Sequence, residues 1–318
     1  MPSYARMILM RISTPRLAAV TAATLLLSAC GGTAGGSDED GVAVVAGFYP
    51  LEWAAERIGG DAIEVSSLTP PGAEAHDLEL TPQDVAAVSE ADLVVHLEGF
   101  QPAVDEAATS EAGDRAWDAG EAADLSLTAD DAAHEGEEEG HADEPAADPH
   151  FWLDPTRLAA VGDALAERLA EVAPDDADTF EKNAADLRAD LEQLDEEIRT
   201  GLADCAVRTL VTAHDAFGYF ADRYGLEVHG ISGLSPSQEP EPAQLAEIAE
   251  LVADEGVTTV YTETLVDPAV ADTVAAEAGV RTAVLDPVEG LTEASEGEDY
   301  LAVMRANLAT LREGQACS

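Results

Sequence analysis

The sequence predicts an α/β protein in which two lobes with parallel sheets are joined by one long helix. Two series of short apolar strands alternate with helical segments, one series in each half of the chain. Between them lies a stretch whose apolar residues recur every three or four positions, the pattern of a long amphipathic helix. At 318 residues the chain is long enough to form two hydrophobic cores.

The N-terminal lobe is predicted to span residues 42–172. Short apolar runs bounded by turn residues predict strands at 41–47, 63–68 and 91–97. A helix is expected to begin near Glu52. Another begins after Thr81, since Thr is a favourable N-cap and Pro82 suits the first helical position. Asp154-Pro155 opens a further helix in the same way, and it continues to about residue 172.

One segment inside this lobe, residues 118–148, has a different composition. It contains 12 Asp and Glu residues, His134 and His141, and no Lys or Arg. Few apolar residues and many like charges cannot bury a core, so a disordered loop is expected. The two histidines fit either a solvating role or weak, transient metal capture.

The linking helix is assigned to residues 173–204, because five apolar residues form a single stripe there: Leu187, Leu191, Leu194, Ile198 and Leu202. A helix of roughly 28 residues is about 40 Å long, enough to run along two lobes. The C-terminal lobe then spans 205–318. Its strands are expected at 208–212, 228–231, 257–262 and 281–285, with helices at 215–224, 243–255, 268–278 and 299–312.

The N-terminus carries an export signal. Residues 1–29 combine three Arg residues and no acid with a short apolar stretch and small residues, which predicts a signal peptide. The Leu27-Ser-Ala-Cys-Gly31 junction resembles a bacterial lipobox, in which Cys30 is lipidated; an ordinary signal with an incidental Cys is the alternative. Residues 30–41 form a flexible tether. We therefore expect an extracytoplasmic protein, lipid-anchored to the outer face of the cell membrane.

The net charge limits the kinds of partner that the chain can bind, and the cysteine content indicates a disulfide. A formal net charge of −50 excludes nucleic acid as a partner, because phosphate contacts need clustered Lys and Arg. Cys205 and Cys317 remain if Cys30 is lipidated, in a compartment that permits disulfides. We favour a disulfide between them over two free thiols.

The residues with metal-binding chemistry lie just after predicted strands. His76, His150, His214 and Asp286 occupy loops of this kind, and ligands in open parallel sheets collect at the carboxyl ends of strands. Three imidazoles and one carboxylate drawn from both lobes would form a closed four-coordinate zinc site. His96 and His229 lie within or near strands and are interpreted as core or edge residues. Phosphate-loop, nucleophile-elbow and H-E-x-x-H motifs are absent from the sequence.

The lipobox and four ordered motifs resemble the zinc- and manganese-binding solute-binding lipoproteins of ABC importers, the ZnuA-like group. The motifs are Gly72-Ala-Glu-Ala-His-Asp-Leu-Glu-Leu-Thr-Pro82, Asp148-Pro-His-Phe-Trp-Leu-Asp-Pro155, Thr212-Ala-His-Asp-Ala-Phe-Gly-Tyr219 and Tyr261-Thr-Glu263. The resemblance runs from about residue 42 to the C-terminus. It implies a metal cleft between two lobes, with His76 and His150 from the first and His214 and Asp286 from the second.

The resemblance implies that the chain is a binding protein and not an enzyme. It would capture Zn²⁺ and deliver it to the permease and ATPase of an ABC transporter. Glu263 competes with Asp286 as the fourth ligand, but is expected to orient a ligand or cap a helix. Mn²⁺ is the alternative cargo, although His214 as third ligand favours zinc. The alternative functions are an adhesin of the same family and a secreted zinc hydrolase using His76, His150 and His214.

Overall fold

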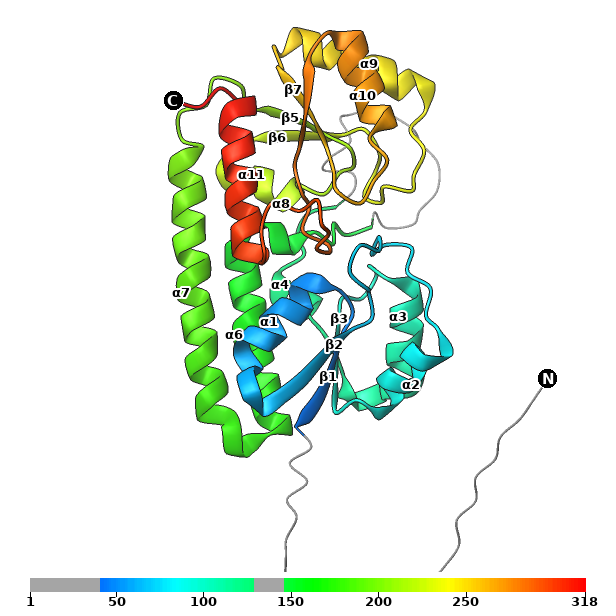
Figure 1. Cartoon of the computed structure of the whole chain (residues 1–318), viewed down its shortest axis with the longest axis vertical. Helices are drawn as coiled ribbons and strands as arrows, with labels where there is room; N and C mark the ends of the chain where they lie inside the picture. The colour runs from blue at the N-terminus through cyan, green and yellow to red at the C-terminus, as the bar shows by residue number, and fades with distance from the viewer. Residues whose placement is uncertain (1–40, 129–145) are drawn as a thin grey trace, which may run out of the picture. The chain divides into compact units, whose positions relative to one another are not determined.

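The computed structural model describes residues 41–128 and 146–318, and they form the predicted α/β fold with two parallel sheets (Figure 1). The predicted signal peptide, Cys30, nearly all of the tether, His134 and His141 lie outside the described residues. Within the described ranges, no helix combines the length and the apolar character needed to cross a membrane.

The first sheet has the strand order β2-β1-β3-β4, and all neighbours are parallel. Its strands are β1 (Val42–Ala46), β2 (Ile63–Ser67), β3 (Leu93–His96) and β4 (Ala116–Asp118). The accompanying helices are α1 (Tyr49–Gly59), α2 (Pro82–Glu90), α3 (Pro102–Ala107), α4 (Gly120–Ala123) and α6 (Pro155–Val172). Alternate strand residues pack against α2 and α3 on one face and against α1 and α6 on the other, so the sheet is covered on both sides.

Helix starts follow the predicted capping residues. The Thr81 side chain accepts from the backbone N–H of Asp84, and the Asp84 carboxylate accepts from that of Thr81, which completes a capping box. Asp154 caps α6 by accepting from the backbone N–H of Thr156. Helix α1 begins at Tyr49, earlier than predicted, with Pro50 in its first turn.

Two predictions for this lobe need correction. Helix α3, strand β4 and helix α4 were not predicted; each has three to six residues, too few for a hydrophobic period to emerge. The segment 118–148 is also ordered at both ends, because α4 packs on α6 and Thr128 forms an antiparallel bridge with Ala147. Residues 129–145 lie outside the described residues.

The second sheet repeats the same topology, with the order β6-β5-β7-β8 and parallel neighbours throughout. Its strands are β5 (Thr209–Thr212), β6 (Glu227–Gly230), β7 (Thr259–Thr262) and β8 (Arg281–Val284). The helices are α8 (Gly218–Tyr224), α9 (Pro242–Asp254), α10 (Ala269–Ala278) and α11 (Tyr300–Gly314). Helices α9 and α10 cover one face, while α8 and α11 lie on the other.

The long helix is α7 (Ala177–Gly201), which follows a 3-10 turn at Pro174–Asp176. It packs against α1 and α6 of the first lobe and against α11 of the second (Figure 1). Its apolar stripe is buried, as the sequence predicted, and belongs to a single core cluster that includes residues of both lobes. The two lobes therefore share hydrophobic packing along this helix.

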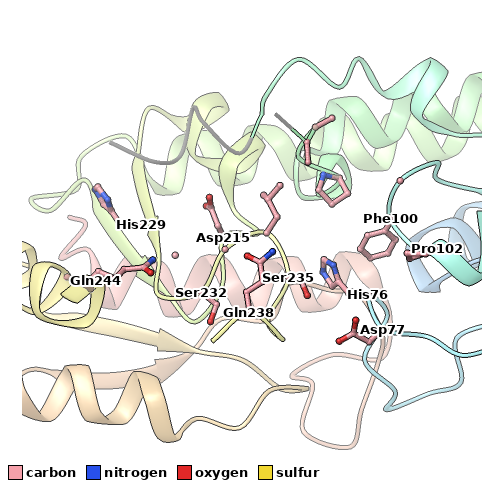
Figure 2. A pocket seen from close by; sticks show the side chains of 18 of the residues that line it. His76, Asp77, Phe100, Pro102, Asp215, His229, Ser232, Ser235, Gln238 and Gln244 are labelled. Atoms are coloured by element: carbon pink, nitrogen blue, oxygen red, sulfur yellow. The ribbon is translucent and has the colours of Figure 1, made fainter. Parts of the chain in front are cut away.

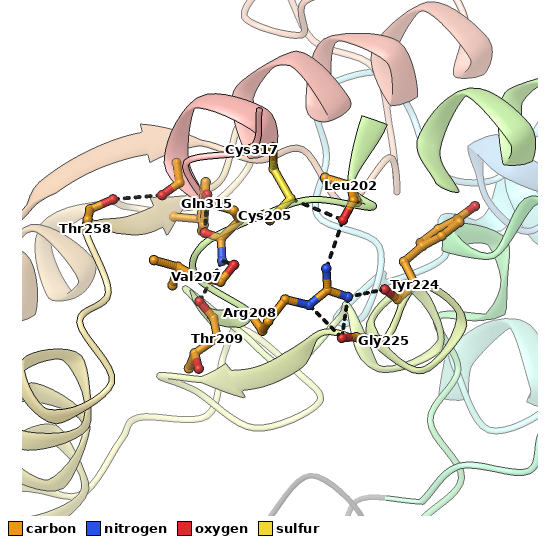
Figure 3. The surroundings of a disulfide bond; sticks show 12 residues. Leu202, Cys205, Val207, Arg208, Thr209, Tyr224, Gly225, Thr258, Gln315 and Cys317 are labelled. Carbon is orange, nitrogen blue, oxygen red and sulfur yellow. Dashed lines mark hydrogen bonds between the residues drawn. A yellow bond between two sulfur atoms is a disulfide. The ribbon is translucent and has the colours of Figure 1, made fainter. Parts of the chain in front are cut away.

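The predicted disulfide between Cys205 and Cys317 is confirmed and ties the C-terminus to the chain that follows α7 (Figure 3). Arg208 lies beside it and donates to the carbonyl oxygens of Leu202, Tyr224 and Gly225. These bonds connect the end of α7 with the end of α8 beside the disulfide. This junction lies next to the start of β5.

Candidate metal centre

His76 lies in the loop between β2 and α2 and is only 8% exposed. Glu74 holds the backbone there, because its carboxylate accepts from the N–H groups of His76 (2.8 Å) and Asp77 (3.0 Å). The side-chain amide of Gln101 donates to the carbonyl of Ala75 (3.0 Å). The loop is thus fixed by side chains on both sides of the histidine.

His150 is fully buried just before α6, and Asp148 orients it. Oδ1 of Asp148 accepts from the backbone N–H of His150 (2.9 Å) and lies 2.7 Å from its Nδ1. The carboxylate therefore keeps the ring proton on Nδ1 and leaves Nε2 as an acceptor. On the same segment, Trp152 donates to the carbonyl of Pro287 in the second lobe (2.8 Å), so this segment is held between the lobes.

His214 follows β5 and is also fully buried. Glu263, at the end of β7, accepts from the backbone N–H of His214 (3.0 Å) and lies 2.7 Å from its Nδ1. Helix α8 begins at Gly218 and not at Asp215 as predicted, and the N–H of Asp215 donates to the carbonyl of Gly233 in a neighbouring loop (3.0 Å). The turn at residues 213–215 places His214 at the carboxyl end of strand β5.

Glu289 lies in the loop after β8 and is 2% exposed. Asp286 organises that loop: its carboxylate accepts from the N–H of Val288 (2.8 Å) and from the hydroxyls of Ser295 (2.8 Å) and Thr264 (3.3 Å). Val288 adopts a φ of 59°, which is rare for a β-branched residue. As a result of this turn, the Asp286 carboxylate points into its own loop and the Glu289 carboxylate faces the histidines.

The four side chains converge on one point. Nε2 of His150 lies 3.3 Å from Nε2 of His76 and 3.3 Å from Nε2 of His214. Oε1 of Glu289 lies 3.4, 3.5 and 3.2 Å from the Nε2 atoms of His76, His150 and His214. A tetrahedron with metal–ligand distances typical of zinc has edges of about 3.3–3.4 Å, and these five distances are close to that value. All four donor atoms lie within 4.8 Å of one another.

The electrostatics of the group also favour a cation. Burial opposes protonation of His214, but the carboxylates of Glu263 and Glu289 outweigh it and hold its pKa well above the usual value. The pKa of His150 is raised in the same sense, by Asp148 and Glu289 against burial. Burial alone would raise the pKa of Glu289, yet contacts with the three histidines bring it well below the usual value. A buried carboxylate among imidazoles concentrates negative potential where a cation binds.

The pattern matches a described family. A family model for ZnuA, the zinc-uptake complex component A, periplasmic, matches residues 44–314. The chain belongs to the ZnuA family. Among curated members, zinc-binding protein AdcA of Streptococcus pyogenes serotype M3 is 37% identical over 290 residues, which cover 86% of this chain and 56% of AdcA. The chain thus spans about half the length of AdcA.

Other proteins match over all or nearly all of their length. High-affinity zinc uptake system protein ZnuA of Bacillus subtilis is 34% identical over 308 residues, 92% of this chain and 95% of that protein. A crystal structure of ZnuA superposes with a TM-score of 0.74 at 28% identity, covering 87% of this chain and all of that one. The laminin-binding protein Lmb of Streptococcus agalactiae, described as bifunctional with adhesin and metal transporting activity, has a TM-score of 0.74 at 30% identity and covers 86% of this chain.

In this ZnuA-family chain a cavity of about 690 Å³ opens beside the four-residue group. Figure 2 shows His76, Asp77, Phe100 and Pro102 on one side, and Asp215, His229, Ser232 and Gln244 on the other. Residues of both lobes therefore line the cavity. Burial, followed by the charge of Asp148, raises the pKa of Asp215 to about 6.

The structure brings together three of the four residues predicted to bind metal in this family member. His76, His150 and His214 meet, whereas Asp286, the predicted fourth ligand, lies outside this group: its carboxylate is engaged by its own loop, and Glu289 lies beside the three histidines. Glu263 orients His214 and caps no helix.

The remaining histidines of the described residues lie outside the group. His96 Nδ1 lies 3.2 Å from Oδ1 of Asp105, and His229 Nε2 lies 3.4 Å from Oε1 of Glu227. Sequence reasoning missed two contributors, Glu289 and Asp148. The available signal for Glu289 was its place three residues after Asp286, in a loop already singled out.

Proposed function

We propose that this chain binds one Zn²⁺ ion between His76, His150, His214 and Glu289 and delivers it to an ABC importer. The observation that carries the proposal is the spacing of the four donor atoms. Two neutral Nε2 acceptors 3.3 Å apart repel each other unless a proton or a metal lies between them, and a tetrahedral zinc ion satisfies all four donors at once.

The donor set supports zinc over manganese. Three imidazole nitrogens and one carboxylate oxygen suit a four-coordinate zinc ion, whereas manganese prefers an octahedral set of oxygens. The same closed set argues against a zinc hydrolase, since catalytic zinc needs an open position for water. In our proposal Glu289 fills that position.

Delivery and location follow from the family and the N-terminus. A zinc-uptake component implies a permease and its ATPase as partners, and we infer that the lobes separate on docking to release the ion. The junction at Cys30 supports a lipid anchor on the outer face of the cell membrane. Adhesion is a second candidate function, favoured by the likeness to the laminin-binding protein Lmb. Binding to immobilised laminin, with and without zinc, tests it.

Titration calorimetry of the metal-free protein with Zn²⁺ tests the metal proposal. We expect tight binding of one ion per chain, and loss of that binding in His214→Ala. His229→Ala is the matched control, because His229 lies outside the group of four and is expected to leave the titration unchanged. Absence of a tight single site, or an undiminished affinity in His214→Ala, would contradict the proposal.

A further inference from the structure

Asp148 contacts both lobes with its two carboxylate oxygens. Oδ1 faces the first lobe, where it accepts from the backbone N–H of His150 and lies 2.7 Å from Nδ1 of the ring. Oδ2 faces the second lobe and lies against Gly218, the first residue of α8. Asp148 is 3% exposed, so its carboxylate is enclosed by protein on both sides.

Gly218 leaves space for that carboxylate. A Cβ atom at position 218 would lie 2.5 Å from Oδ2 of Asp148 and 3.5 Å from Cδ1 of Leu127. The first distance is a collision and the second an ordinary contact. Gly218 is not among the glycines with positive φ, so its backbone conformation is open to other residues. The close approach of Asp148 is therefore what requires glycine here.

The surrounding backbone is fixed, which makes the Asp148 carboxylate the group that would yield. The N–H of Asp148 donates to the carbonyl of Leu127 (2.9 Å), and the N–H of Leu127 donates to the hydroxyl of Tyr219 (3.2 Å). The Tyr219 ring in turn lies under Arg157, with 4.4 Å from the guanidinium carbon to the ring centroid. These contacts link the first lobe to the side chain of Tyr219, the residue that follows Gly218 in α8.

We propose that Gly218 is a positioning residue for metal binding, which acts from the second lobe through Asp148 on His150. The inference rests on the proposed zinc-binding function and extends it to a residue outside the four ligands. A methyl group at position 218 would push Oδ2 away and rotate the carboxylate, and Oδ1 would then lose its alignment with the imidazole. His150 would no longer be held with Nε2 toward the other donors.

Gly218→Ala tests the inference, with Gly41→Ala as the control. A Cβ at position 41 would meet its nearest neighbour at 3.6 Å, an ordinary contact. We expect Gly218→Ala to weaken Zn²⁺ binding by about tenfold, the lower end of the range for residues behind a metal ligand. We also expect the visible absorption spectrum of the Co²⁺-loaded protein to change, because that spectrum reports ligand geometry. The metal-free Gly218→Ala variant should still unfold in one cooperative transition, and the Zn²⁺ affinity of Gly41→Ala should match the wild type.

A double-mutant cycle separates this route from a general packing effect. Asp148→Ala removes the carboxylate and should itself weaken binding by about 10- to 100-fold. In that background the methyl at position 218 meets no carboxylate, so Gly218→Ala should cause no further loss. Asp148→Ser, with its shorter side chain, is a second background should the alanine variant unfold.

The outcomes are distinct. Unchanged Zn²⁺ affinity in Gly218→Ala, or the same fold loss with and without Asp148, overturns the inference while zinc binding by the wild type stands. If the wild type binds no Zn²⁺, the proposed function fails and the inference fails with it.

Discussion

Glu263 engages His214 twice, at the backbone N–H through Oε1 and at Nδ1 through Oε2. Both contacts need an acceptor oxygen, and a carboxylate supplies two. In Glu263→Gln one of the two donors would face an amide N–H₂ group. If that donor is Nδ1, the ring proton moves to Nε2 and blocks the atom that faces the metal. We expect Glu263→Gln to weaken Zn²⁺ binding by about 10- to 100-fold in a competition titration with a chelator.

Glu277→Gln is the matched control, since Glu277 is exposed on α10. It makes the same chemical change far from any histidine of the group and should leave the affinity unaltered. An equal affinity in the two variants would show that Glu263 does not tune His214.

Glu289 and Asp286 are expected to respond differently to loss of charge. Glu289→Gln removes the only carboxylate of the four-residue group, so zinc affinity should fall steeply while the fold is kept. Asp286→Asn weakens the bonds to Ser295, Thr264 and the N–H of Val288, and should lower the free energy of unfolding by about 1–3 kcal/mol. Zinc K-edge absorption should report the same ligand set in Asp286→Asn as in the wild type. A changed ligand set in that variant would show that Asp286 is a zinc ligand in the wild type.

This pair shows where sequence reasoning reached its limit. The correct loop could be predicted, because ligands gather after parallel strands and Asp286 follows one directly. The acid that faces the histidines could not be predicted, because Val288 takes a φ of 59° that no pattern assigns to a β-branched residue, and the chain direction at Glu289 depends on it. A left-handed residue of this type costs about 1–3 kcal/mol and persists only when its surroundings enforce it.

Zinc affinity should rise with pH through the neutral range. Against burial, Glu263 and Glu289 hold the pKa of His214 well above its usual value, so a proton competes with zinc for this imidazole in the metal-free protein. Zinc must displace that proton, so each displaced proton adds about one unit of log K per pH unit below the folded pKa. Calorimetry at neutral pH in buffers of different ionisation enthalpy should detect proton release. Equal affinity at about pH 6 and about pH 8 would contradict it.

The stability of the metal-free protein should change in the opposite direction. A raised histidine pKa contributes stability that is fully present below the unfolded value of 6.5 and is lost as pH rises through the folded value. The lowered pKa of Glu289 contributes stability that is lost only well below 4.5, outside this window. The increase in melting temperature on adding zinc should therefore grow with pH.

The disulfide is expected to matter for stability and not for the site. Cys205 and Cys317 are 112 residues apart, and a loop of that size corresponds to about 5 kcal/mol of unfolded-state entropy in the chain-closure description. The double variant Cys205→Ser, Cys317→Ser should lose about that much in urea unfolding. Its zinc affinity should match the wild type, because the pair contacts the Leu202 carbonyl and none of the four ligands. An affinity loss would link this junction to the cleft.

Local signals account for most of the fold that could be predicted. Thr81-Pro82 and Asp154-Pro155 mark helix starts because capping is a property of adjacent residues, and α2 and α6 begin there. The apolar stripe of α7 also predicts its helix, since a helix that buries one face needs apolar residues along that face. Strand β4 and helix α4 have three and four residues, and their stability comes from neighbours that are distant in sequence.

Exposure is uneven around the group of four. His150 and His214 are fully enclosed and Glu289 nearly so, whereas the edge of His76 reaches the cavity. An ion held by the four residues would therefore lie nearest to solvent on the side of His76. The residence time of a bound ion then depends on the barrier to separation of the lobes and on the bond between the ion and His76. A variant at His76 should therefore shorten the residence time of the ion.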